Sequence, residues 1–564
     1  MPRVPLLVLG PLLRYVGETE ATIWVETSEP CDVEILDANA RTFEVGGHHY
    51  ALLYVEGLEP DSITPYTVSL DGEQVWPEPD YPFPEPAIRT PKANEPIRMV
   101  WGSCRVSVPH EPPFSERKDD DPRGREIDAL YAYALRMVDR PREEWPHVLM
   151  LLGDQVYADE VSPKTREFIR TRRSPSEPPG EEVADFEEYC HLYQEAWRDP
   201  VIRWLLSTVS TAMIWDDHDV HDDWNTSKTW LEEMRALPWW KERIDGAIMS
   251  YWLYQHWGNL SPRELEDDGV WTKVCEADGD AGPLLREFAF KADREVEGVR
   301  WSYCRDVSKS RLIVMDSRGG RVLEPDERKM VDDEEWDWIV EHATEGGFNH
   351  LILATTLPLL LPEALHWLEA WDEAIAEGAW GERFKKLGEK IRQGLDLEHW
   401  AAFQASFHRV VDLVREVGSG KHGEPPASIV FLSGDVHNAY LARVAFRRED
   451  GVVCPVWQGV CSPFRNPLDR HEQMAVKFSA SRPVGEVMKR LALRAGVEDP
   501  GIRWETVAGP AFDNQVATLD WEGREAKMTL EKAVPSDPRK PDLELTFECE
   551  LAGGGVGGAS SRAR

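Results

Sequence analysis

Carboxylate, imidazole, thiol and phenol side chains recur in this sequence directly after short apolar segments. The segment GDQVYAD (153–159) follows the apolar run Val148–Leu152. Four similar runs are followed by GSCR (102–105), DDHDVHDD (216–223), DSR (316–318) and SGDVHN (433–438). Asp oxygens, His nitrogens and the anionic forms of Tyr and Cys are the groups by which proteins hold metal ions. The pattern therefore predicts a metal site.

The spacing also indicates what such a site would do. Asp154 follows Gly153, and an Asp at a glycine turn can bridge two ions with its two oxygens. A two-metal site suits phosphoester hydrolysis, because it lowers the pKa of a bound water, clamps the phosphate oxygens and offsets their charge. His218 lies between carboxylates that should raise its pKa and orient its ring, so we expect it to give a proton to the leaving alkoxide.

Each of these residues also has a simpler interpretation. Asp154 could cap a helix, and Cys104 could be a small buried apolar residue. The segment 216–223 could be a solvated acidic run, but it holds five carboxylates beside a buried strand. Such carboxylates repel one another unless cations neutralise them. Taken together, the segments favour the metal interpretation.

Polar residues around these segments have candidate supporting roles. Arg318 could bind a substrate phosphate through two hydrogen bonds or pair with local carboxylates, and both alternatives stay open. Asn438, next to His437, is the second candidate for substrate binding. Asp159, Asp219 and His221 are expected to support the ligands rather than to be ligands.

The elements that must position these residues are strands alternating with helices. From about Ile97 onward, helical patterns such as Glu126–Val138 and Trp400–Val417 separate apolar runs. The expected strands are Ile97–Trp101, Val148–Leu152, Ala212–Trp215, Leu312–Met315, Leu351–Ala354 and Ile429–Leu432. This alternation predicts an α/β domain over 94–549, with ligands at the carboxyl ends of its strands.

A different pattern precedes this region. Short alternating strands separated by turn clusters predict an all-β domain over residues 1–90. Gly57–Asp61 followed by Tyr66 resembles the E–F corner of fibronectin type III domains, which favours a β-sandwich. The Pro-rich stretch Trp76–Pro91 reads as a linker and 550–564 as a disordered tail.

Composition narrows the classes of partner. The net charge of −38, from 102 acidic and 64 basic residues, disfavours binding to nucleic acid or anionic lipid. The eight cysteines form no CxxC pair, and no stretch reaches the roughly 20 apolar residues of a membrane span. The apolar start reads as a β-strand and not as a signal peptide, so a cytoplasmic location is expected, with secretion as the alternative. No obligate protein partner can be inferred.

The segments together resemble a known family. GDQVY resembles the GDxxY element of calcineurin-like metallophosphoesterases, especially purple acid phosphatases. GSC, GDQVYAD, WDDHDV and GDVH, in this order, resemble the alkaline phosphatase D (PhoD-like) family. The resemblance implies a four-layer αββα sandwich of two sheets flanked by helices, preceded by an all-β sandwich. It also implies phosphomonoesterase or phosphodiesterase activity on a small phosphate ester, through a metal-activated hydroxide at a binuclear or multinuclear site.

The same resemblance implies the metals and their ligands. A ferric ion (Fe³⁺, iron) would be held by Cys104, Asp154, Tyr157 and His437. A second position, occupied in the family by calcium, would be shared by Asp154, Asp217 and Asp435; Mg²⁺ and Mn²⁺ are alternatives there.

One departure bears on the second position. Relatives in the superfamily usually have another His ligand after the strand expected at Leu351–Ala354, where this chain has Thr355-Thr356. Without that nitrogen the position becomes all-oxygen, which favours Ca²⁺ or Mg²⁺ over Zn²⁺. The rival hypotheses are a phospholipase D-like or nucleotide phosphodiesterase activity at the same site, and a binding protein whose metal site is structural.

Overall fold

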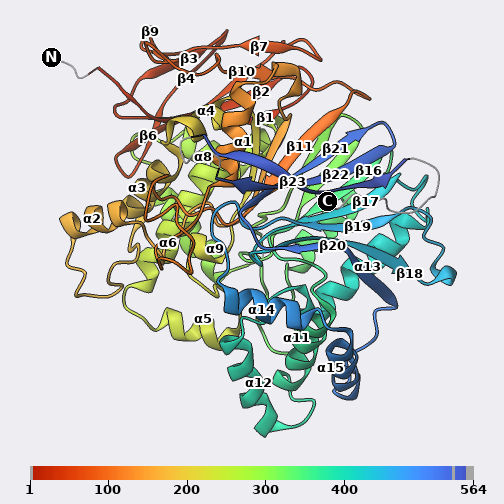
Figure 1. Cartoon of the computed structure of the whole chain (residues 1–564). Helices are drawn as coiled ribbons and strands as arrows, with labels where there is room; N and C mark the ends of the chain where they lie inside the picture. The colour runs from red at the N-terminus through yellow and green to blue at the C-terminus, as the bar shows by residue number, and fades with distance from the viewer. Residues whose placement is uncertain (1–3, 297, 536–539, 554–564) are drawn as a thin grey trace.

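The computed structural model describes residues 4–296, 298–535 and 540–553 (Figure 1). Two four-stranded sheets form most of its N-terminal part. One has the order β1 (Leu7–Val16), β2 (Ala21–Thr27), β6 (His48–Val55), β5 (Phe43–Val45), and the other β4 (Ala38–Arg41), β3 (Asp32–Ile35), β8 (Val68–Leu70), β9 (Glu73–Trp76). In β3, Val33 and Ile35 are buried while Asp32 and Glu34 are exposed, as expected of a strand with one face on the core. This confirms the expected N-terminal all-β region.

Two details of this region differ from the expectations. The stretch read as a linker contains β10 (Ala87–Arg89), which pairs antiparallel with β7 (Ile63–Pro65). The hydroxyl of Tyr66 does not bond within the described part of the all-β region: it donates to the carbonyl of Ser207 at 2.5 Å. The residue that resembled a fibronectin corner therefore joins the all-β region to the rest of the chain.

The remainder of the chain is built on two larger sheets. The six-stranded sheet has the order β13 (Ser210–Ile214), β12 (Val148–Leu152), β11 (Ile97–Gly102), β21 (Gln515–Glu522), β22 (Glu525–Val534), β23 (Asp542–Ala552). The seven-stranded sheet has the order β14 (Tyr303–Val307), β15 (Ser310–Val314), β16 (His350–Ala354), β17 (Ser428–Ser433), β19 (Val456–Val460), β18 (Ala439–Phe446), β20 (Ile502–Ala511).

Fifteen α-helices are present in the described residues: α1 (Ala129–Val138), α2 (Pro163–Arg172), α3 (Phe186–Trp197), α4 (Pro200–Thr208), α5 (Lys228–Arg235), α6 (Trp240–Tyr251), α7 (Pro262–Asp267), α8 (Gly269–Cys275), α9 (Gly282–Arg294), α10 (Asp333–Thr344), α11 (Glu363–Ala376), α12 (Glu382–Gly394), α13 (Gln404–Gly418), α14 (Arg470–Ser479) and α15 (Arg482–Arg494). The expected helix at Glu126–Val138 starts later because Asp128 caps it, accepting a hydrogen bond from the Tyr131 amide. The one expected at Trp400–Val417 begins with a 3₁₀ turn, Trp400–Ala402, before α13.

The two sheets pack face to face and helices cover their outer faces. In β16 and β17, Ile352 and Val430 join the core between the sheets, while Leu351 and Ile429 join a second core under α10 and α13. Successive residues of a strand point to opposite faces, so both faces of these strands are buried, as their continuous apolar runs predict. The expected α/β architecture is confirmed.

The all-β region shares its core with the larger sheets. Arg14 of β1 is fully buried and donates to the carbonyls of Tyr254 at 2.7 Å and Gln255 at 2.6 Å. The indole of Trp24 donates to the carbonyl of Leu253 at 2.9 Å.

Two further observations concern the ends of the chain and its helices. β23 extends to Ala552, into the stretch expected as a tail, and residues 554–564 of that stretch lie outside the described residues. In the part of the chain that the structure describes, no helix is both long and apolar enough to cross a bilayer.

Candidate metal site

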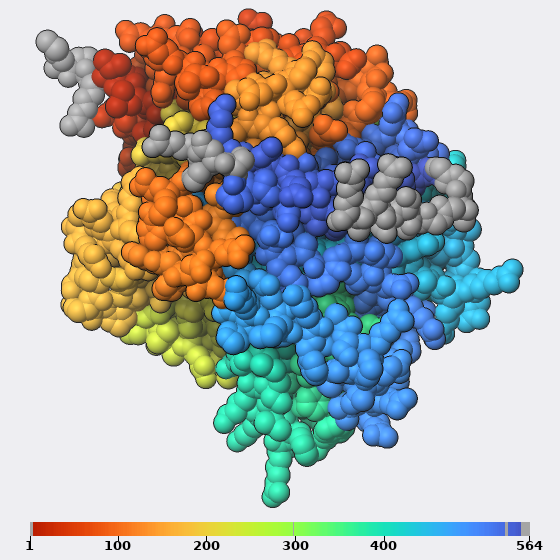
Figure 2. All heavy atoms as spheres, in the orientation of Figure 1, coloured from red at the N-terminus to blue at the C-terminus, as the bar shows by residue number. Residues whose placement is uncertain are grey.

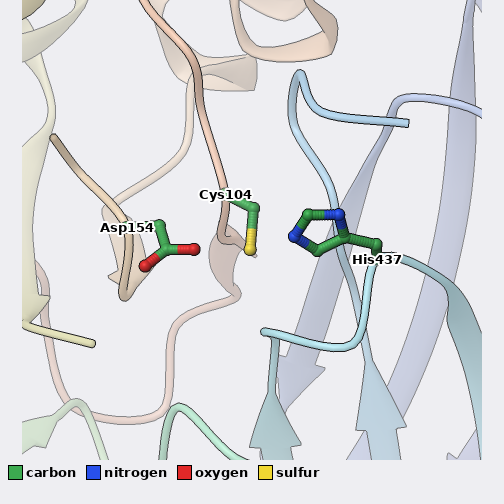
Figure 3. Close-up of side chains that lie close together, drawn as sticks. All are labelled: Cys104, Asp154 and His437. Carbon is green, nitrogen blue, oxygen red and sulfur yellow. The ribbon is translucent and has the colours of Figure 1, made fainter. Parts of the chain in front are cut away.

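Three side chains expected as ligands converge from the two sheets. Cys104 follows β11 and Asp154 follows the neighbouring parallel strand β12, while His437 follows β17 of the other sheet. One ligand atom from each lies within 4.8 Å of the others. Figure 3 shows the thiol between the carboxylate and the imidazole. Parallel strands bring residues at their carboxyl ends to one edge, as the sequence pattern required.

The backbone at these positions is left-handed. The φ angles are 54° at Cys104, 49° at Asp154, 63° at Asp435 and 48° at His437. Residues other than glycine adopt this region at a cost of about 1–3 kcal/mol, and such strain gathers at functional sites. The four turns thus hold side chains at angles that an ordinary strand end would not give.

Two further groups of ligands extend the cluster. Asp154, Asp217 and His218 form one group with ligand atoms within 4.8 Å, and Asp216, Asp217 and Asp435 form another. Asp154 belongs to the first two groups and Asp217 to the last two, so the three groups are continuous. This is the arrangement expected if Asp154 bridges two cations.

Burial and crowding make this cluster a fit for cations. Burial raises the pKa of Asp154 well above its usual range, and neighbouring carboxylates such as Asp217 raise it further, against the opposing effect of His218. Asp154 Oδ1 is buried and has no hydrogen-bond partner among the described residues, and the buried Asp217 Oδ1 lies 3.3 Å from Arg318 Nη2. Buried carboxylate oxygens of this kind need a proton or a cation. The donor set of carboxylates, imidazole, thiol and phenol suits metal ions.

His437 and Tyr157 have the properties of ligands to the first position. Burial lowers the pKa of His437 to about 4, so its imidazole is neutral and has a free lone pair for a metal. The hydroxyl of Tyr157 lies 3.2 Å from Asp154 Oδ2, and the amide of Asn466 donates to it at 3.3 Å.

His218 is held by a carboxylate from another segment. Its Nδ1 lies 2.9 Å from Asp159 Oδ2, and its Nε2 lies 3.7 Å from Asp222. Burial alone would lower the pKa of His218, but the carboxylates of Asp159, Asp217 and Asp154 outweigh it and raise that pKa well above its usual value. The pairing with Asp159 therefore favours the protonated form of His218, which lies at the edge of the cluster.

Asp219 links the segments 153–159 and 216–223. Its carboxylate accepts from the Val156 amide at 3.2 Å and from the Asp216 amide at 2.8 Å. Gly153 allows this close approach, because a Cβ there would lie 2.5 Å from the Cβ of Asp216. His221 does not face the cluster: its Nδ1 contacts the carbonyl of Asp222 and its ring packs near Trp230.

Arg318 and Asn438 do not lie as substrate-binding residues would. Arg318 is fully buried and pairs with Asp216 and Glu398, with Asp217 at 3.3 Å and with Asp435 at 3.8 Å. All of this agrees with the alternative in which Arg318 pairs with carboxylates. The Asn438 amide turns back on its own loop and donates to the carbonyl of Val436 at 2.7 Å.

A histidine that the sequence patterns missed lies beside Asp435. His399 Nε2 is 3.3 Å from Asp435 Oδ2 and has no hydrogen-bond partner among the described residues, while its Nδ1 is 2.7 Å from Glu369 of α11. Metal-binding histidines are usually held in this way, with the second ring nitrogen on a carboxylate. Thr355 stands where relatives usually have a His ligand, and its side chain is buried.

Two other neighbours were also missed. Glu398 pairs with Arg318 and with Arg321 at 3.3 Å. Asn466 follows β19, an apolar strand at the same sheet edge, so the strand-end pattern could have found it. Glu398 and His399 precede a 3₁₀ turn and carry no motif.

Comparison with known proteins agrees with this geometry. Residues 129–270, which include Asp154, Tyr157, Asp217 and His218, match the family model described as PhoD-like phosphatase. The chain carries a PhoD-like phosphatase domain. The family resemblance of the motifs is thereby confirmed, and the match supports a phosphoric ester hydrolase.

Other comparisons concern the N-terminal region and the fold of the chain. Residues 4–88 match a model described as "Domain of unknown function (DUF7800)". The solved structure of PhoD is similar with a TM-score of 0.60 and 12% identity, over 100% of this chain and 93% of that one. The structure of the purple acid phosphatase PPD1 from yellow lupin (Lupinus luteus) seeds has a TM-score of 0.47 and 10% sequence identity, over 98% of this chain and 75% of that one. No curated protein sequence matches the chain.

Proposed function

We propose that this chain hydrolyses phosphate mono- or diesters at a site for at least two cations centred on Asp154. The observation that carries the proposal is the position of Asp154, which belongs to two of the three ligand groups and has a buried Oδ1 without a hydrogen-bond partner among the described residues. Cys104, Tyr157 and His437 would hold the first cation, and Asp217 and Asp435 the second. Bound cations would supply a hydroxide nucleophile and offset the phosphate charge.

The protein's own groups would do the remaining work. His218, charged and fixed by Asp159, would give its proton to the leaving alkoxide. Arg318 would hold Asp217 and Asp435 in place by its ion pairs and would not touch the ester. Asp219 would hold the segments 153–159 and 216–223 together through its bonds to the Val156 and Asp216 amides.

The metals are proposed from the donor set together with the family resemblance. Thiol, phenol and carboxylate at the first position suit Fe³⁺, and carboxylates at the second suit Ca²⁺, Mg²⁺ or Mn²⁺. His399 adds a nitrogen near the second position, which the sequence had led us to expect as all-oxygen. Elemental analysis of protein purified without chelator should find iron together with a divalent cation, and zinc alone would contradict this assignment.

The decisive experiment joins metal content to turnover. Asp154→Ala should lose both bound metal and hydrolysis of p-nitrophenyl phosphate or its bis ester. Full activity after metal loss would overturn the proposal, because hydrolysis would then not depend on this metal site. Metal binding by the wild type without hydrolysis of any ester would favour a binding protein with a structural metal site. Comparing the two esters with a nucleotide diester and a phospholipid would identify the class of ester.

A further inference from the structure

Three amphipathic helices group at one end of the molecule, away from the all-β region. The helices α12, α14 and α15 each contact α11, and they lie together at the lower end in Figure 1. On the space-filling view of Figure 2 they form the lower part of the visible face. Trp367 and Ala370 of α11 pack against Ala492 of α15 in a small apolar core.

The solvent faces of these helices are unusually apolar. No residue of α14 is buried, and its Met474 and Phe478 are 57% and 68% exposed. These two residues are four apart and therefore share one helix face. Among the described residues, eight of the sixteen exposed large apolar side chains fall within 380–395 and 474–493: Trp380, Phe384, Leu387, Leu395, Met474, Phe478, Val487 and Leu493. Exposed apolar residues gathered in this way mark a surface that binds something.

The same helices have a positive net charge, although the net charge of the whole chain is negative. Together they carry eleven Lys or Arg residues and four Glu, whereas the whole chain has 64 basic and 102 acidic residues. Many of these cations are free: the structure gives no ion pair with any described residue for five exposed ones, Arg383, Lys386, Lys390, Arg490 and Arg494.

We infer that this face, formed by α12, α14 and α15, docks on an anionic lipid bilayer. Helices with basic residues beside Phe, Leu and Met lie in the membrane interface, where acyl chains take the apolar groups and headgroups take the cations. Each Lys or Arg near such a surface contributes about 1 kcal/mol. A second copy of this chain fits less well, because its identical face would oppose cation to cation.

The orientation of the docked protein follows from the start of α14. Arg470 pairs with Asp119 at 3.1 Å, and Lys118 reaches Glu472 at 3.5 Å, so the loop 106–124 is tied to this helix. Asn466, which donates to Tyr157, lies four residues before Arg470. Docking by this face would bring the rim of the candidate metal site toward the headgroups. The docking itself does not depend on the proposed hydrolase function.

Vesicle flotation tests the inference with the full chain. The protein should float with vesicles of phosphatidylcholine and phosphatidylglycerol, float much less with phosphatidylcholine alone, and be released by about 0.5 M salt, which screens surface charge. Two double variants, Lys386→Glu with Lys390→Glu and Met474→Ser with Phe478→Ser, should each weaken binding about tenfold or more. Val453→Ser is the matched control, because Val453 is 74% exposed outside these helices.

Each outcome of these measurements supports or overturns docking on lipid. All these residues are exposed and outside the metal cluster, so thermal unfolding and turnover of a soluble phosphate ester should stay unchanged in each variant. Equal flotation of wild type with neutral and anionic vesicles, or unchanged flotation of both double variants, would overturn the inference. So would a wild-type dimer in sedimentation that the Met474→Ser, Phe478→Ser variant abolishes, since a second copy would then cover the face.

Discussion

The imidazole of His218 is held by Asp159, with 2.9 Å between Nδ1 and Oδ2. The two residues come from different segments, and the carbonyl of His218 also accepts from the Ala158 amide at 2.8 Å. Both the backbone and the side chain of His218 are therefore held in place. Nε2 lies on the side of the ring away from Asp159. A proton donor needs this combination of orientation and charge.

Replacing either partner should change turnover and its pH dependence. His218→Gln should lower kcat by about 10²- to 10⁴-fold, the usual contribution of a general acid. His218 works in its protonated form, so activity is present below its pKa and is lost as pH rises through it. Asp159→Asn removes a carboxylate that raises this pKa, so the alkaline limb of kcat should move to lower pH. Glu160→Gln, an exposed neighbour, should leave the profile unchanged, and an identical limb in Asp159→Asn would contradict the role given to His218.

His399 should contribute to holding the second cation. His399→Gln removes the nitrogen that lies 3.3 Å from Asp435, and Glu369→Gln weakens the group that orients it. Loss of such an outer partner typically lowers metal affinity about 10- to 100-fold. Metal titration should therefore show weaker binding of one cation in both variants, with the other retained. Unchanged affinity for both cations would mean that His399 only neutralises its two carboxylates.

Removing cations should destabilise the fold. Asp154 Oδ1 is buried beside other carboxylates and has no hydrogen-bond partner among the described residues, and a bound cation stabilises only the folded state. At a free concentration 100-fold above Kd this amounts to about 2.7 kcal/mol. Chelator should therefore lower Tm, and the matching cation should restore it. In Asp154→Ala the same treatment should shift Tm less; an equal shift would place the stabilising cation elsewhere.

Arg14 should hold the all-β region on the larger sheets. Arg14→Met removes two short bonds to the carbonyls of Tyr254 and Gln255 and leaves these acceptors buried, a loss of roughly 3 kcal/mol or more in the free energy of unfolding. Arg41→Met is the control, because Arg41 is half exposed and pairs only with surface groups, where changes stay within about 0.5 kcal/mol. Equal stability of the two variants would show that the interface depends on apolar packing alone.

The strand-end pattern predicted much of the site because its geometry is local to each turn. Val148–Leu152 was predicted with the bounds that the structure gives, and Asp154 follows it as expected. His399 and Glu369 could not be predicted: His399 reaches Asp435 from a turn and Glu369 reaches His399 from α11, and the positions of both elements depend on long-range packing. Tyr66 was misread for the same reason: its own segment gives no sign that its hydroxyl bonds to Ser207.

The left-handed turns at Cys104, Asp154, Asp435 and His437 limit which residues can ever stand there. Asp and Asn adopt this backbone more readily than other side chains, and branched residues such as Val or Thr are largely excluded. The accessible exchanges at these positions therefore run mainly between Asp, Asn, Gly and the residues now present. Homologous sites could drift between carboxylate and amide ligands, and so between cations of different charge, while the loops that carry them keep their shape.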